Sequence, residues 1–418
     1  MSAPSPPTTE PTAPREHAFA RRWTSVSWAI FAAVALRLAA IAWLAPPASW
    51  DGAIYARLAE GLARGQGYVH WGGNGRPTAF FPVGFPAAIA AVMVATGAGA
   101  TVAAWVVNVL SSALTTLAAS SIGRAIDGEP GARRAAWAFA LYPAMILWSA
   151  AAMTETLQCA WITVAFALAI GQPRAQNPSA RAVLLGVATG LATLVRPQGI
   201  LLAPLLGALS DARSITARAK SAVIALVTAL ALVSPWSLRN ARTLDGPALV
   251  STNGGSNLLI GTLPEARGGY RELTDRDACA TVQGEVRRDR CMSRVAIERI
   301  ARAPGSWAWL AVRKIARTVG FEWAPVSYAR STVPERISRW IGVALALVCT
   351  ACWWLTLAAS ARFVVRHRRS DVAVAAVGSF AAVVLVHAAF IADDRYHLVL
   401  VGPLCAIAAG SFRARSTE

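Results

Sequence analysis

The sequence carries little charge for its length. Asp, Glu, Lys and Arg make up 15% of the 418 residues, whereas 55% are hydrophobic, which is too little charge to cover the surface of a soluble chain. Lysine occurs only at Lys220 and Lys314, so the net charge of +18 comes almost entirely from arginine. These arginines lie in short clusters between apolar blocks, and no basic stripe with interleaved aromatic residues is present. The pattern therefore argues against nucleic-acid binding.

Several common catalytic motifs are also missing. The sequence has no G-x-x-x-x-G-K-[S/T] and no H-E-x-x-H, which excludes a P-loop nucleotide site and a zinc-protease site of that type. It also has no soluble nucleotide-sugar domain. Cysteine is scarce, and Cys349-x-x-Cys352 lies inside an apolar block, where a redox or zinc role is not expected. Cys279 and Cys291 lie in a long polar loop, and whether they pair is left open.

Apolar blocks of about 20 residues dominate the chain, which is the length that crosses a bilayer as a helix. We therefore predict an all-α polytopic membrane protein with about ten transmembrane helices plus a half-helix. The half-helix is 83–96, expected to be re-entrant or interfacial. Block 182–209 is expected to form two short helices that break at Arg196-Pro197. The other expected spans are 23–44, 102–122, 135–153, 156–170, 221–235, 337–359, 372–392 and 397–411.

Arginine clusters set the expected direction of these spans, because short cytoplasmic loops are enriched in Lys and Arg. Residues 1–22 are predicted to be a disordered cytoplasmic tail, 23–413 the membrane domain and 414–418 a second cytoplasmic tail. Two polar regions then fall outside, a first loop at 45–82 and a large loop at 237–336. Within the large loop, 293–302 and 307–319 have the pattern of amphipathic helices, the latter lying on the membrane surface. The protein is expected in the plasma (cell inner) membrane.

Two acidic residues on the outer side are the strongest catalytic candidates. Asp51 follows the first span in S-W-D-G-A-I-Y, where Tyr55, Leu58 and Leu62 predict a helix with Asp51 at its N-cap. Asp51 is therefore either a helix cap or a general base held at the membrane surface. Glu155 lies at the end of a span, where a carboxylate is costly in lipid. It either faces a cavity or forms an ion pair with an arginine.

Further candidates on the same side could bind an anionic or polyhydroxylated substrate. Arg196 could contact a phosphate or pair with Glu155, and Arg76 lies in a rigid, aromatic-rich loop suited to a lid. The segment around Asn253 is dense in turn residues and amides, and an ordinary loop is the alternative. The residues predicted to bind such a substrate are Tyr55, Arg76, Arg196, Arg239, Asn240, Asn253, Asn257, Arg395 and Tyr396.

The ordered set of these segments resembles a known family over roughly 23–413. It is similar to the family-39 membrane glycosyltransferases, which include the protein O-mannosyltransferases and the aminoarabinose transferases and have the C-type fold. The matching segments are S-W-D-G-A-I-Y-A-R-L-A-E-G-L, P-T-A-F-F-P-V-G-F-P, Y-P-A-M-I-L-W-S-A-A-A-M-T-E-T-L, L-A-T-L-V-R-P-Q-G and D-D-R-Y-H.

The resemblance implies transfer of a single sugar from a polyprenyl-phosphate-linked donor to an acceptor at the extracytoplasmic face. Asp51 matches the family's catalytic acid, and Glu155 lies where relatives often have a second acid. Many protein-mannosylating relatives have two adjacent acids at the first position, whereas Gly52 follows Asp51 here. The acceptor, a lipid, glycan or protein, is therefore left open, as is dependence on a divalent cation. The alternative function is a transporter or flippase of a lipid-linked substrate, with broken helices and intramembrane charge.

Overall fold

The protein is an all-helical membrane protein. The structure, a computed structural model, describes residues 15–171 and 177–412, and no strand occurs among them. Of the tail predicted to be disordered at 1–22, residues 1–14 lie outside the described residues, and 15–22 are helical as the start of the first helix. The tail predicted at 414–418 also lies outside the described residues. Six of the described helices are long and apolar enough to cross a bilayer. These are α1 (Arg15–Leu44), α4 (Ala100–Ala140), α7 (Pro178–Val195), α9 (Ile215–Thr243), α14 (Arg339–Arg366) and α15 (Asp371–Ala389).

Four shorter apolar stretches lie among the long helices. They are α3 (Gly84–Thr96), α6 (Glu155–Ile170), η1 (Pro197–Leu201) with α8 (Leu202–Leu209), and η3 (Tyr396–Leu400) with α16 (Val401–Gly410). The expected break at Arg196-Pro197 is present, since α7 ends at Val195 and a 3₁₀ turn follows. Proline disfavours helical conformation in the residue before it, which accounts for this break. The prediction of about ten crossings requires the short stretches to cross as well, and it stays a prediction.

The region predicted as spans 102–122 and 135–153 folds differently. Helix α4 runs from Ala100 to Ala140 but bends sharply at Asp127 and Gly128, and Gly128 has a φ of 56°. The chain turns back at this bend and brings Gly123 and Gly131 into close backbone contact. A Cβ on Gly123 would lie only 2.4 Å from the carbonyl oxygen of Gly131. The second expected span is wrong in its bounds. It is interrupted after Ala140, and a short helix, α5 (Pro143–Trp148), begins at the next proline.

The predicted start of the large loop falls within a helix. Helix α9 continues through the expected boundary at 237 and ends at Thr243, with Pro235 inside it. The helices outside the apolar stretches are α2 (Asp51–Ala63), α10 (Gly254–Ile260), η2 (Pro264–Ala266), α11 (Glu285–Arg302), α12 (Pro304–Val319) and α13 (Ala324–Thr332). The two amphipathic helices predicted in the loop are therefore present as the longer α11 and α12. A disulfide joins Cys279, in the loop before α11, to Cys291 within α11.

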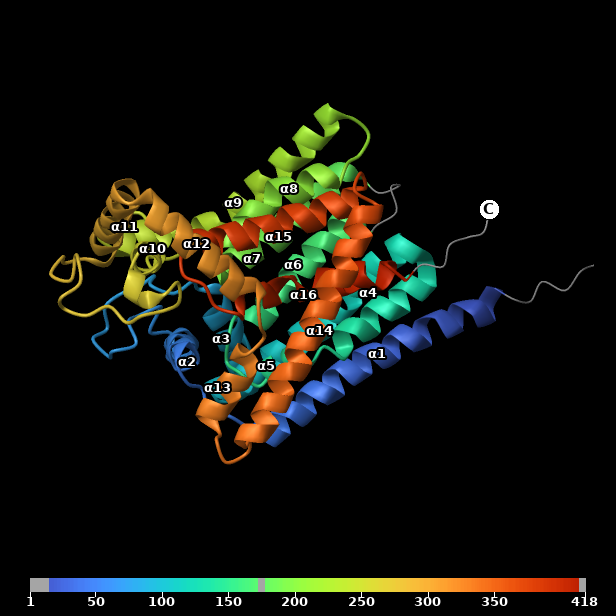
Figure 1. The fold of residues 1–418 in the computed structure, drawn as a ribbon, viewed down its shortest axis with the longest axis horizontal. Helices are drawn as coiled ribbons and strands as arrows, with labels where there is room; N and C mark the ends of the chain where they lie inside the picture. Colours follow the sequence, from blue (N-terminus) through green and yellow to red (C-terminus); the bar gives the residue numbers. More distant parts are fainter. Residues whose placement is uncertain (1–14, 172–176, 413–418) are drawn as a thin grey trace, which may run out of the picture.

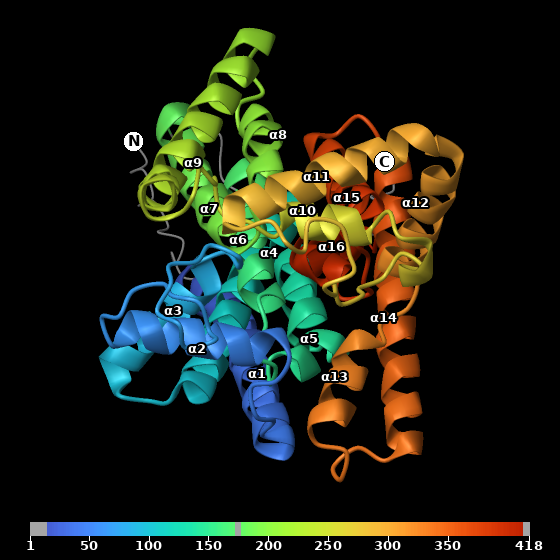
Figure 2. The ribbon, with the colours of Figure 1, turned by 90° about the vertical axis from the view of Figure 1, so that its left-hand side faces the viewer.

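The polar helices gather at one end of the molecule. Helices α10 and α11, with the loop that follows α2, lie on the left in Figure 1, whereas α1 extends to the opposite end. Figure 2 views the molecule from that left-hand side, with α11 and α10 in front of the apolar helices.

A buried arginine joins the two N-terminal long helices. Arg37 of α1 is fully buried, and its Nη1 donates to the carbonyl oxygen of Ala140 at 2.7 Å. Its Nη2 donates to Phe139 at 3.2 Å. The last carbonyl groups of a helix have no partners within that helix, and a cation is favourable at this end. Arg37 therefore satisfies the end of α4 where the chain turns toward α5.

Candidate active site

Asp51 begins α2, and its carboxylate does not cap that helix. The N-cap position is occupied by Trp50, with a φ of 55°, and no side-chain cap hydrogen bond is present at this helix end. The expectation that Asp51 is the N-cap is therefore wrong by one position. A positive φ is costly for a bulky residue. The conformation of Trp50 turns the chain from the first span into α2. Asp51 then points toward Arg395, and 3.4 Å separate Asp51 Oδ2 from Arg395 Nη2.

Gly52 allows α2 to approach the connection between α5 and α6. A Cβ at this position would lie 2.8 Å from the carbonyl oxygen of Ala152 and 3.4 Å from the hydroxyl of Tyr328. Tyr328 in turn lies 3.4 Å from both the backbone nitrogen and the carbonyl oxygen of Ser49. Position 52 thus has no room for a larger side chain. The start of α2 is fixed by backbone contact instead.

Glu155 is a fully buried carboxylate at the start of α6. Its Oε1 pairs with Arg196 Nη2, and its Oε2 accepts from Trp148 Nε1 at 3.1 Å. Arg196 Nε also donates to the hydroxyl of Thr154 at 2.8 Å. The ion pair expected as one alternative for Glu155 is therefore present. It lies where the break between α7 and η1 meets the N-terminus of α6, an end of a helix that favours negative charge.

Arg395 connects these groups. Its side chain is 17% exposed, and its Nε lies 3.2 Å from Asp393 Oδ2 and 3.7 Å from Glu155 Oε1, in addition to the contact with Asp51. Burial by itself lowers the pKa of this guanidinium, but the nearby carboxylates, Glu155 foremost, outweigh burial and hold the pKa well above its usual value. Arg395 therefore stays charged and holds three carboxylates from three separate segments.

Tyr396 provides an aromatic surface beside both arginines. The guanidinium carbon of Arg196 lies 5.2 Å from the centre of its ring, and that of Arg395 lies at 5.5 Å. His387 stacks on the same ring at 4.0 Å. Cation–π contacts of this kind add to the ion pairs in a desolvated site. The ring of Tyr396 thus helps to orient both arginines.

Tyr55 lies one turn after Asp51 on α2 and is buried. Its ring packs edge-on against Phe81 and Phe85, with centroid distances of 5.2 and 5.7 Å. Burial and then the neighbouring Asp51 carboxylate raise the pKa of its hydroxyl. Tyr55 therefore stays protonated and can donate a hydrogen bond next to Asp51.

Arg239 and Asn240 belong to a separate network that holds the first loop. Arg239 donates to the carbonyl oxygens of Tyr68 and Thr78, each at 2.7 Å, and Asn240 donates to Ala248 at 3.2 Å. Glu285 of α11 accepts from the hydroxyl and backbone of the same loop, at Thr78 and Ala79, both at 2.7 Å. Arg239 thus positions loop 68–79, and Asn240 holds Arg239 in turn by accepting from its Nη1 at 3.1 Å.

The remaining predicted donor-binding residues lie apart from the Asp51–Arg395 pair. Asn253 accepts from Ser251 at 2.9 Å, and Asn257 lies half-buried in α10. Arg76 is exposed in the first loop, and its backbone carbonyl accepts from His70. No contact in the described part of the chain joins these three side chains to Arg395.

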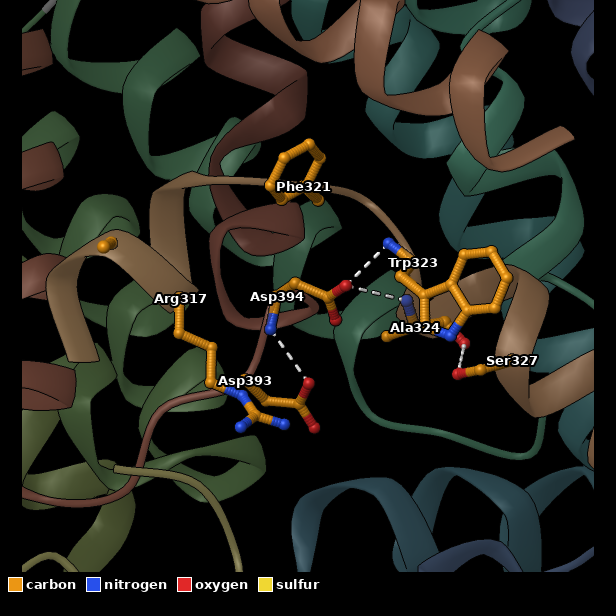
Figure 3. Close-up of a pocket in the computed structure, with 8 residues that line it drawn as sticks. Arg317, Phe321, Trp323, Ala324, Ser327, Asp393 and Asp394 are labelled. Atoms are coloured by element: carbon orange, nitrogen blue, oxygen red, sulfur yellow. Dashed lines mark hydrogen bonds between the residues drawn. The ribbon is translucent and has the colours of Figure 1, made fainter. Parts of the chain in front are cut away.

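Residues that sequence reasoning did not place in the site hold Arg395 in position. Lys314 Nζ donates to the carbonyl oxygens of Ala388 and Ala389, each at 3.0 Å, at the end of α15. Asp394 Oδ2 accepts from the backbone nitrogens of Trp323 and Ala324 at 2.6 and 2.9 Å (Figure 3). The segment 314–324 is thereby joined to the segment 388–397. The acidic pair before Arg395 was visible in D-D-R-Y-H, but its partners could not be read from sequence.

A buried polar cluster completes the connection between these two segments. Glu322 is fully buried, and its Oε1 accepts from the hydroxyl of Tyr142 at 2.6 Å and lies 2.9 Å from His397 Nε2. His397 Nδ1 lies 2.6 Å from the carbonyl oxygen of Thr318, so this nitrogen must carry a proton. His397 also stacks on Trp353 at 3.9 Å. The cluster fixes the start of η3, and therefore Arg395 before it.

The described residues do not assemble an obvious metal site. No group of three or more His, Cys, Asp or Glu side chains among them could hold an ion. Asp51 and Asp393, the two more exposed carboxylates, are both occupied by Arg395. The divalent cation left open on sequence grounds thus has no preformed ligand set among these side chains.

No protein-family model and no curated protein matches the chain by sequence. Solved structures do match. The oligosaccharyltransferase of Archaeoglobus fulgidus, tethered to an acceptor peptide, matches with a TM-score of 0.54 and 14% identity, over 93% of this chain and 49% of that one. Its complex with an inhibitory peptide and a dolichol-phosphate gives 0.52 and 12%, over 93% and 50%.

ArnT from Cupriavidus metallidurans, bound to undecaprenyl phosphate, matches with a TM-score of 0.43 and 14% identity, over 95% of this chain and 78% of that one. The chain spans about half the length of the archaeal oligosaccharyltransferase. The protein thus has the C-type fold of the membrane glycosyltransferases.

Proposed function

We propose that this protein transfers a single sugar from a polyprenyl-phosphate-linked donor to a lipid, glycan or protein acceptor at the extracytoplasmic face, with Asp51 as general base. The observation that carries the proposal is the position of Asp51. Its side chain is 38% exposed, is not used as a helix cap, and lies against Arg395. The structures that share the fold include an enzyme solved with a dolichol-phosphate, which supports a lipid-linked donor.

The chemistry follows from this position. Asp51 takes the proton of an acceptor hydroxyl as that oxygen attacks the anomeric carbon of the donor sugar. The bond between the anomeric carbon and the phosphate oxygen breaks, and the polyprenyl phosphate leaves with the electron pair. General base catalysis by a positioned carboxylate contributes about 10² to 10⁴-fold in rate.

The charges around Asp51 suit this step. Three carboxylates, Asp51, Glu155 and Asp393, face two guanidinium groups, Arg196 and Arg395. When Asp51 accepts a proton, one negative charge is lost and Arg395 is held less strongly. Arg395 can then stabilise the phosphate as its negative charge grows. Arg196, paired with Glu155 and close to Tyr396, serves mainly to keep that arrangement in place.

Two features support an extracytoplasmic site in the cell inner membrane. Arginine clusters in the short loops favour an outside position for Asp51, Glu155 and Arg395 under the positive-inside rule. The disulfide between Cys279 and Cys291 in the large loop favours the same side for that loop, because disulfides persist in oxidising compartments.

The test is consumption of radiolabelled polyprenyl-phosphate sugars by the purified protein in lipid nanodiscs, with crude membrane acceptors present. Wild type should release sugar from one donor of the panel, and Asp51→Asn should lower the rate by at least about 100-fold. Glu60 is a half-buried acid on the same helix with a similar side-chain exposure of 36%, so Glu60→Gln is the matched control and should keep full activity.

Two results would count against the proposal. Full activity in Asp51→Asn would remove Asp51 from the mechanism. If wild type consumed no donor but moved lipid-linked sugars between leaflets, the flippase alternative would replace the transferase.

A further inference from the structure

A cavity of about 400 Å³ opens beside the candidate active site. It lies between the end of α12, the start of α13 and the loop that carries Arg395 (Figure 3). This volume is within the range of small-molecule sites. The side chains that line it and matter here are Arg317, Phe321, Trp323, Ser327, Asp393 and Asp394.

The cavity walls are held by the contacts already described. Asp394 accepts from the backbone nitrogens of Trp323 and Ala324, and its own backbone nitrogen donates to Asp393 Oδ1 at 2.8 Å. These bonds, shown dashed in Figure 3, fix the backbone of both walls. The cavity is therefore preformed, which lowers the entropic cost of binding a ligand.

Two aromatic side chains border the cavity without packing against other rings in the described chain. Phe321 is 71% exposed and Trp323 is 40% exposed. A pyranose ring presents C–H groups on its faces and hydroxyl groups around its edge. Flat aromatic surfaces suit the faces of the ring, and carboxylate oxygens accept hydrogen bonds from the hydroxyl groups. Trp323 and the acidic pair Asp393–Asp394 supply both kinds of contact.

The charges at the cavity are balanced, which suits a neutral ligand. The two acidic side chains that line it, Asp393 and Asp394, are matched by Arg317 in the lining and by Arg395 against Asp393. Asp393 also pairs with Arg395 Nε at 3.2 Å, and Arg395 contacts Asp51. A sugar held by Asp393 would therefore lie next to the carboxylate that takes the proton.

We infer that this cavity binds a neutral pyranose ring, with Trp323 as the stacking surface and Asp393 and Asp394 as acceptors for its hydroxyl groups. The inference rests on the proposed function, since it assigns the sugar-binding part of the same site. The ring can belong to the donor or to a glycan acceptor, and the two share this chemistry.

Binding is measured without turnover, by saturation-transfer NMR of methyl pyranosides of glucose, mannose, galactose, N-acetylglucosamine and arabinose. The protein is held in phospholipid nanodiscs, because a maltoside detergent would itself occupy a sugar site. Wild type should give a signal with at least one glycoside. Trp323→Ala should weaken binding about tenfold, and Trp323→Phe should retain most of it.

Control variants separate this cavity from the rest of the protein. Trp309→Ala removes a tryptophan that is 63% exposed on α12 and does not line the cavity, so binding should be unchanged. Asp51→Asn should also bind normally while losing transfer. This pair of results distinguishes failure of the cavity assignment from failure of the proposed reaction.

Competition identifies the source of the ring. If the donor consumed in the transfer assay displaces the bound glycoside, the cavity holds the donor sugar, and if both bind together it holds the acceptor. The inference is overturned if no glycoside binds wild type at millimolar concentration, or if Trp323→Ala binds as well as wild type.

Discussion

Arg395 and Asp51 are separated by 344 positions in the sequence, yet Arg395 Nη2 and Asp51 Oδ2 are 3.4 Å apart. The same guanidinium contacts Asp393 and Glu155 through its Nε. One side chain near the C-terminus thus joins the start of α2, the start of α6 and the loop after α15. These contacts join a guanidinium to carboxylates in a largely desolvated site. The strength of such charged hydrogen bonds depends on the planar geometry of the guanidinium as well as on its charge.

Arg395→Lys is therefore expected to lose most activity although the charge is kept. A lysine ammonium is a single point charge and cannot reproduce the planar guanidinium that reaches three carboxylates. We expect kcat for sugar transfer to fall by about 100-fold, as for loss of one transition-state donor. Arg313→Lys, on the exposed side of α12, is the control. Retained activity in Arg395→Lys would show that only net charge is needed here.

The Glu155–Arg196 pair should behave as a buried ion pair. Removing one partner leaves an uncompensated charge, so Glu155→Gln and Arg196→Gln should each destabilise the protein by about 3–5 kcal/mol. The double variant should lose less than the sum of the two, because it leaves neither charge unpaired. Thermal unfolding in nanodiscs measures all three variants.

The surface pair of half-buried Glu60 and exposed Arg64, 3.5 Å apart on α2, provides the comparison. Its removal should cost about 0–1 kcal/mol, as for surface pairs generally. Additive losses at Glu155 and Arg196, equal to the two single effects together, would mean that the two side chains act independently.

Gly52→Ala tests whether the close approach of α2 positions Asp51. The added Cβ would lie 2.8 Å from the carbonyl oxygen of Ala152, so the start of α2 must shift. We expect a clear drop in kcat, since displacements near 1 Å in a reacting group can cost about 10²-fold. Gly305→Ala adds the same methyl group to open space on α12 and should have no effect. Normal activity in Gly52→Ala would show that Asp51 tolerates movement of its helix.

Asp394 should make stability depend on pH. Burial, followed by the neighbouring Asp393, raises the pKa of this carboxyl to about 7 in the folded protein, against about 3.9 for an unperturbed aspartate. A raised pKa means that the folded state binds the proton more tightly. The stabilising contribution is therefore complete below about pH 4 and is lost as the pH rises toward about 7.

Asp394→Asn should flatten this dependence. The amide oxygen can still accept from Trp323 and Ala324, and the amide cannot ionise. Wild type and variant should unfold at similar temperatures at pH 4, and the variant at a higher temperature at pH 8. If both proteins show the same change in unfolding temperature between pH 4 and pH 8, Asp394 does not titrate in this range.

Part of the site could be predicted because local sequence fixes it. Asp51, Glu155 and Arg196 each lie at a point where an apolar helix begins or ends, and charge in such a chain is affordable only at such points or in pairs. Arg196 precedes a proline that breaks the helix, which the sequence shows directly. These three residues and the last charged cluster, Arg395-Tyr396, are the ones that the structure brings together.

The partners of these residues could not be predicted in the same way. Arg239 and Asn240 follow an apolar helix as the site residues do, yet Arg239 bonds to loop 68–79 and Asn240 bonds to Ala248. For Lys314 the sequence predicts only a position in an amphipathic helix, and Glu322 follows the end of that helix. Their contacts with 388–397 depend on how helices far apart in the chain pack, which local patterns do not encode.

The sequence by itself determined that the protein folds in a bilayer, that it is helical, and that charged residues lie at the ends of its apolar helices. A chain with so few charges must satisfy its backbone in lipid as helices, and that constraint is local. Only the tertiary structure decided which charges neutralise one another. In the folded chain α4 bends back at Gly128, and a new helix begins at Pro143. Arg395 lies against Asp51. The physical reason is that ion pairs and close helix contacts depend on distances in space, and residues 344 positions apart carry no local sign of their contact.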